Sequence, residues 1–234
     1  MAQPGPDPKK ANAKAARAAA AAEKRRVAEE LRSRTAEQLE AAKSTVERLE
    51  GQFHATSETA ARRDALSSHL KGFYAEIDKL TKGKALMPVT DLVVERTNEI
   101  VRDAKAIVEG DTYLDRVKEF VPAGDNPVYP DVLMTARTVM ESLERFKSRL
   151  EATEKQIAKL FREARTIQAA AQLYLDNDFV PSKEQVKAVL GGKFISDTWF
   201  STDETSEEES FDFERLDRCR LEEYFSSGGQ REVA

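Results

Sequence analysis

The sequence predicts an all-α protein, an elongated antiparallel helical hairpin or three- to four-helix bundle with coiled-coil-like packing and flexible termini. The main observation is a stripe of thirteen positions, spaced alternately by four and three residues, in which only Thr153 is not apolar. A mean spacing of 3.5 residues keeps one face of an α-helix against a partner. The stripe comprises Val132, Ala136, Val139, Leu143, Phe146, Leu150, Thr153, Ile157, Leu160, Ala164, Ile167, Ala171 and Tyr174.

A second apolar stripe supplies a partner for the first. Within residues 35–81, apolar side chains recur at heptad spacing on either side of a polar stretch near Gly51. At a rise of about 1.5 Å per residue, residues 131–176 form a rod of about 69 Å, and residues 35–81 form one of nearly the same length. Two rods of equal length can pack antiparallel, so we expect these segments to pair.

The composition favours helices over a sheet, because 34% of the residues are charged and only 7% are aromatic. A further helix is expected over residues 90–109, beside one end of the pair. A short helix over residues 111–121 follows it, and the proline-rich residues 122–130 form a connector.

The residues within the stripe favour a bundle over a simple two-stranded zipper. If Val132 is a d position, alanines occupy several a positions and Val139 and Phe146 occupy d positions. A parallel zipper prefers the reverse, with β-branched residues at a and leucine at d. Apolar e positions at both ends of the stripe widen it further. Association of two copies of the chain through the remaining face is left open.

Composition divides the chain into four segments. Residues 1–34 are a disordered start and a basic Ala/Lys-rich helical arm, and residues 35–176 are the helical bundle. Residues 177–192 contain a short capping helix that begins with a capping box, in which Ser182 is followed three residues later by Gln185. Residues 193–234 are an acidic, aromatic-containing flexible tail.

No motif points to catalysis, a cofactor or a metal. The two histidines are 15 residues apart and lack the spacing at which two imidazoles bind one metal ion. The one cysteine, Cys219, has no histidine near it in the sequence, and no phosphate-binding glycine loop is present. No apolar run approaches the roughly 20 residues of a membrane span. We therefore expect a non-enzymatic, cytoplasmic protein.

The charged ends of the chain are the places where function is expected. Residues 197–234 hold twelve acids and four arginines, and the last 41 residues hold seven of the 17 aromatic residues. Acidic residues around aromatic anchors suit docking onto a protein partner with a basic groove, which makes the chain a helical scaffold or adaptor. An equally weighted alternative is that these aromatics fold back onto the chain's own bundle. The predicted partner-binding residues are Trp199, Phe200, Phe211, Phe213, Tyr224 and Phe225.

The basic arm suggests a second function, that of a nucleic-acid-associated assembly protein. Residues 1–34 hold nine lysines and arginines against four acids, and such clusters can neutralise phosphates without reading sequence. The simpler interpretation, which we favour, is a solvated helix face. The residues of this alternative site are Lys9, Lys10, Lys14, Arg17, Lys24, Arg25 and Arg26.

Overall fold

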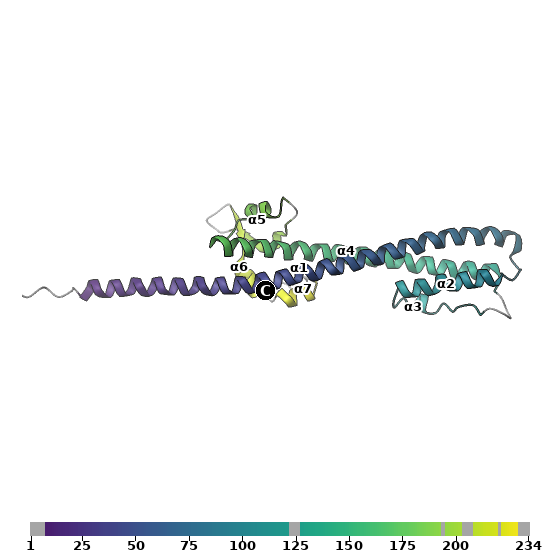
Figure 1. The fold of residues 1–234 in the computed structure, drawn as a ribbon, viewed down its shortest axis with the longest axis horizontal. Helices are drawn as coiled ribbons and strands as arrows, with labels where there is room; N and C mark the ends of the chain where they lie inside the picture. Colours follow the sequence, from purple (N-terminus) through teal and green to yellow (C-terminus); the bar gives the residue numbers. More distant parts are fainter. Residues whose placement is uncertain (1–7, 122–126, 193–194, 203–207, 220, 229–234) are drawn as a thin grey trace, which may run out of the picture. The chain divides into compact units, whose positions relative to one another are not determined.

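Two long helices pack together in a hairpin and form the frame of the protein (Figure 1). They are α1 (Pro8–Lys84) and α4 (Tyr129–Asn177). The architecture was obtained as a computed structural model. The structure describes residues 8–121, 127–192, 195–202, 208–219 and 221–228. The all-α hairpin predicted from the two apolar stripes is confirmed.

Short elements follow each of the long helices. Contacts divide the chain into two units, and each is described by itself: unit 1 is Met1–Glu50 with Lys159–Ala234, and unit 2 is Gly51–Ala158. The remaining elements in the described part of the chain are α2 (Asp91–Ile107), α3 (Thr112–Asp115), α5 (Lys183–Val189), the 3-10 helix η1 (Asp197–Trp199), β1 (Phe200–Thr202), β2 (Glu209–Phe211), α6 (Phe213–Arg218) and α7 (Leu221–Ser226).

The stripe of α4 is buried along most of its length. Ten of its thirteen residues are buried, and the other three, Phe146, Leu150 and Thr153, lie in the middle of the helix. Thr153, the one polar member, is exposed and its hydroxyl donates to the carbonyl of Arg149. The burial of the stripe is therefore interrupted at its centre.

Unit 2 has a core formed by three helices. Leu70 and Phe73 of α1, Val94 and Val101 of α2, and Val132 of α4 belong to one buried cluster. Because α2 places its apolar residues on one side, it covers the α1–α4 pair as a third helix. The helix predicted over residues 90–109 is thus confirmed, beginning after Thr90.

The helix predicted over residues 111–121 is shorter than expected, because α3 ends at Asp115. The side-chain amide of Asn98 donates to the Phe120 carbonyl at 2.8 Å, and its oxygen accepts the Phe120 N–H at 2.8 Å. Lys105 donates to the Val117 carbonyl at 2.7 Å. These backbone groups bond to side chains of α2 instead of to a continued helix. Periodicity alone could not reveal this competition.

Unit 1 contains the part of the chain that the sequence predicts to be a flexible tail, and the described residues there differ from that prediction. They form η1, β1, β2, α6 and α7, which we call the C-terminal layer. Strands β1 and β2 are antiparallel, with Phe200 opposite Phe211. The capping box of α5 is confirmed, since the Ser182 N–H donates to Gln185 Oε1 at 2.8 Å.

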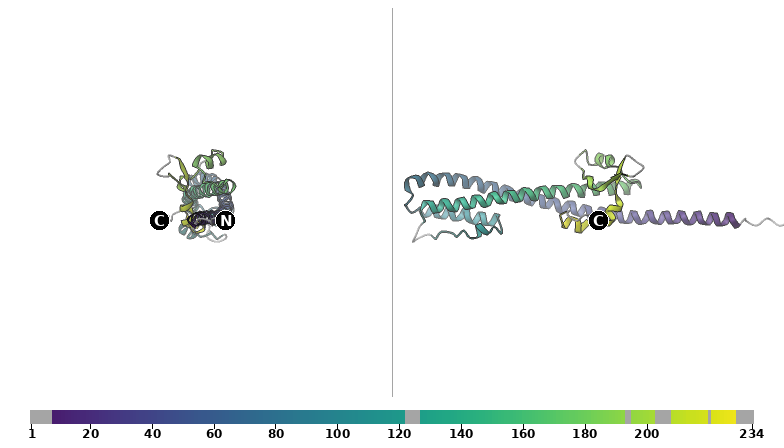
Figure 2. Two further views of the ribbon diagram at one scale, coloured as in Figure 1. Left: turned by 90° about the vertical axis from the view of Figure 1, so that its left-hand side faces the viewer. Right: turned by 180° about the vertical axis from the view of Figure 1, so that it is seen from behind.

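The C-terminal layer is attached to both long helices within unit 1 (Figure 2). Asp217 of α6 accepts from Gln38 of α1 at 2.7 Å, and the Tyr224 hydroxyl of α7 donates to Glu163 of α4 at 3.0 Å. Lys183, at the start of α5, forms an ion pair with Asp197 at 2.8 Å and a second one with Glu209. The hydrogen bonds of these two ion pairs raise the pKa of the Lys183 ammonium.

We predict that Asn98→Ala lowers the free energy of unfolding by about 2 kcal/mol, because two partly buried backbone groups of Phe120 lose their partner. Urea titration followed by circular dichroism measures this change. Asn177→Ala is the matched control, since the exposed Asn177 makes one hydrogen bond to a helix carbonyl. Equal stability of the two variants would contradict the structural role of Asn98.

Candidate functional site

Five of the six aromatic residues predicted to bind a partner are buried in unit 1, and Phe200 is partly buried. Trp199 is fully inaccessible to solvent. Their rings form contacts with one another and with α4, at centroid distances between 4.9 and 5.7 Å. The pairs are Tyr174–Phe213, Phe213–Phe211, Phe211–Phe200, Trp199–Tyr224 and Tyr224–Phe225.

The alternative in which the aromatic residues fold back onto the chain is therefore the arrangement that the structure has. The rings pack on one another and, through Phe213, on Tyr174 of α4. Little of their area is left exposed for a second protein. Binding of a partner through these six residues stays a prediction, and it requires the C-terminal layer to leave α4.

A carboxyl group lies buried beneath the C-terminal layer. Glu163 on α4 is 1% exposed, and its Oε2 accepts the Tyr224 hydroxyl. Burial raises the pKa of the Glu163 carboxyl above its usual range, although the hydrogen bond from Tyr224 opposes this effect. Burial also raises the pKa of Tyr224, and the neighbouring carboxylate adds to the shift. Both raised pKa values favour the protonated forms, the neutral carboxyl of Glu163 and the neutral hydroxyl of Tyr224.

The thiol of Cys219 and the imidazole of His69 are two further titratable groups in the described part of the chain. Burial raises the pKa of the Cys219 thiol, which disfavours the nucleophilic thiolate. His69 contacts Arg96 at 3.1 Å. Within the described part of the chain, no three histidine, cysteine, aspartate or glutamate side chains are grouped so that they could hold a metal ion.

The basic arm is the beginning of α1, and all of residues 16–30 are exposed. Arg26 forms ion pairs with Glu23 at 2.7 Å and with Glu30 at 4.0 Å, so part of the basic charge is neutralised locally. Arg17, Lys24 and Arg25 have no ion pair with the described residues. Lys9, Lys10 and Lys14 lie on the helical backbone, but their side chains are outside the described part. Nucleic-acid binding by the arm stays a prediction.

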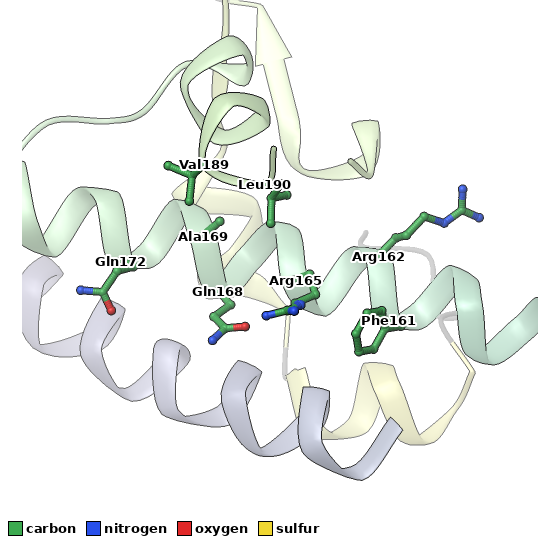
Figure 3. Close-up of a pocket in the computed structure, with 8 residues that line it drawn as sticks. All are labelled: Phe161, Arg162, Arg165, Gln168, Ala169, Gln172, Val189 and Leu190. Atoms are coloured by element: carbon green, nitrogen blue, oxygen red, sulfur yellow. The ribbon is translucent and has the colours of Figure 1, made fainter. Parts of the chain in front are cut away.

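A groove between α4 and α5 offers a better-defined surface in unit 1 (Figure 3). It encloses about 610 Å³. Val189 and Leu190 extend from the end of α5 toward α4, while Arg162 reaches away from Gln168. We call it the α4–α5 groove, and its lining residues are Phe161, Arg162, Arg165, Gln168, Ala169, Gln172, Val189 and Leu190.

The groove combines apolar area with positive charge and one unpaired polar atom. The Arg165 guanidinium lies 5.5 Å from the centre of the Phe161 ring and has no carboxylate partner among the described residues. The side-chain oxygen of Gln168 is buried and accepts no hydrogen bond. Val189 is 58% exposed, which is high for a large apolar side chain. A molecule bound here could cover the apolar groups and pair with Arg165.

Sequence reasoning missed this groove. Phe161 is recognisable as an apolar e position, but Gln168 and Arg165 look like ordinary solvated residues of a helix. The groove exists because α5 returns to α4 after the turn at residues 178–182, and no local pattern encodes that return.

Comparisons with known proteins identify no relative: no protein-family model, no curated protein and no solved structure matches this chain. Within the described residues, none of the helices combines the length and apolar character needed to span a bilayer.

We predict that Glu163→Gln stabilises the protein at pH 7. A carboxyl with a raised pKa contributes its stability below the ordinary glutamate value of about 4.3 and loses it as the pH rises through the folded-state pKa. Glutamine keeps an oxygen for Tyr224 but never ionises. Each unit of pKa elevation corresponds to about 1.4 kcal/mol.

Urea titrations at pH 4 and pH 7 measure the effect. The stability gained by Glu163→Gln should be present at pH 7 and shrink at pH 4, while the exposed control Glu151→Gln changes little at either pH. If Glu163→Gln is less stable than the wild type at pH 7, the ionised carboxylate of Glu163 stabilises the folded protein, and the prediction is wrong.

We also predict that Gln168→Met raises the free energy of unfolding by about 1 kcal/mol, because it removes a buried oxygen without a hydrogen bond at nearly constant side-chain length. The matched control is Gln172→Met, in which a hydrogen bond to Asp176 is lost. Thermal and urea unfolding compare the variants. A destabilised Gln168→Met would mean that the oxygen has a partner in the folded protein.

Proposed function

We propose that this protein is a non-enzymatic helical scaffold or adaptor, and that it binds a protein partner in the α4–α5 groove. One observation carries the proposal: the groove holds exposed apolar area at Val189 beside Arg165, which has no carboxylate partner among the described residues. A bound protein could cover the apolar area and supply a carboxylate for this arginine.

The groove supports partner binding better than the aromatic residues of the C-terminal layer do. Those rings already pack on α4 and on one another, whereas the Val189 side chain is largely exposed. Exposed apolar groups next to charged ones are typical of protein interaction sites. One wall of the groove is α4, the long helix that also contributes to the core of the protein.

Affinity capture of the intact chain from lysate, analysed by mass spectrometry, tests this function. We predict that Arg165→Glu loses partners that the wild type captures, because it reverses the charge at the centre of the groove. Arg149→Glu is the matched control, since Arg149 stacks 5.4 Å from the Phe146 ring in a similar way but lies in unit 2, outside the groove.

Capture unaffected by Arg165→Glu would contradict a role for the groove. Loss of captured proteins after nuclease treatment would instead favour the nucleic-acid alternative of the basic arm.

A further inference from the structure

We propose that the occupant of the α4–α5 groove is an acidic amphipathic helix of another protein, an inference that rests on the proposed function. The groove runs along α4. Phe161, Arg165, Gln168 and Gln172 follow one another at intervals of four, three and four residues along α4. They therefore lie along one side of the helix over about 16 Å, at a rise of about 1.5 Å per residue.

A groove of this direction suits a helix laid alongside α4. Helices that bind in grooves insert apolar residues spaced by three and four positions, the same spacing as the residues of α4 that line this one. Phe161 at one end and the Val189–Leu190 pair on the α5 side provide apolar contact area. Ala169, which also lines the groove, has only a small side chain.

The charge of the groove determines the chemistry of the occupant. Two arginines line it, and none of the lining residues is acidic. Two acids interact with lining residues: Asp176 accepts from Gln172 at 2.9 Å, and the buried Glu163 interacts electrostatically with Arg162. Arg165 has no carboxylate partner among the described residues, so it is the arginine that an acidic occupant can address. A carboxylate carried on the polar flank of the occupant could reach Arg165, whereas a basic flank would be repelled.

The test is selection of a phage-displayed library of helical peptides on the intact protein, followed by fluorescence anisotropy with the strongest peptide. We expect the selected sequences to carry apolar residues spaced by three and four positions and net negative charge. Arg165→Glu should weaken binding of that peptide by about tenfold or more, and Arg149→Glu by less than about twofold. A version of the peptide with lysine in place of its acids should bind Arg165→Glu better than the wild type.

Several results would overturn the proposal. They are selection of neutral, basic or non-helical peptides, failure to select any peptide, and equal effects of the two arginine variants. Self-association of the wild type that Arg165→Glu abolishes, seen by light scattering, would make a second copy of the chain the occupant and overturn it as well.

The inference and the proposed function fail in different ways. If Arg165→Glu abolishes protein capture while the selected peptides are not acidic, the groove binds proteins and only the nature of the occupant is wrong. If protein capture and peptide binding are both indifferent to Arg165→Glu, the groove is not the binding surface and both proposals fall.

Discussion

The apolar stripe of α4 is the constraint on which both units depend. In unit 2, Val132 and Val139 belong to the core that α1 and α2 share. In unit 1, Ala164 and Ala171 are fully buried, and small side chains at such positions allow close packing of neighbouring elements. One helix face with a period of 3.5 residues thus provides a packing surface in two separate cores.

Much of the frame could be predicted from the sequence, because helices are encoded locally. The periodic stripes and the Ser182–Gln185 capping box act between residues that are close in the sequence, and each appears in the structure. The short α3 could not be predicted, since Asn98 reaches a backbone 22 residues away.

The candidate site could not be predicted for the same reason. The contact between Glu163 and Tyr224 joins residues 61 positions apart, and nothing in the local sequence marks this glutamate among the many others as buried. The aromatic residues of the C-terminal layer were recognised as important, but both free docking and folding back fit their pattern. Only the three-dimensional contacts distinguish the two.

Both units hold polar groups that a protein selected for stability alone would avoid. Among the described residues, the buried side-chain atoms without a hydrogen bond include Gln38 Oε1, Gln168 Oε1 and Trp199 Nε1 in unit 1 and Arg63 Nε in unit 2. Glu163 adds a buried carboxyl, which accepts from the Tyr224 hydroxyl and lies 3.9 Å from the Lys159 ammonium.

Hydrogen–deuterium exchange of the intact protein, with and without a captured partner or a selected peptide, measures the location of binding most directly. We expect slower exchange in peptides covering residues 161–172 and 183–190, which contain the groove, and unchanged exchange in residues 129–150 of the same helix. Protection confined to residues 208–228 or to residues 16–34 would contradict binding in the α4–α5 groove, and would return the binding site to the aromatic or the basic end of the chain.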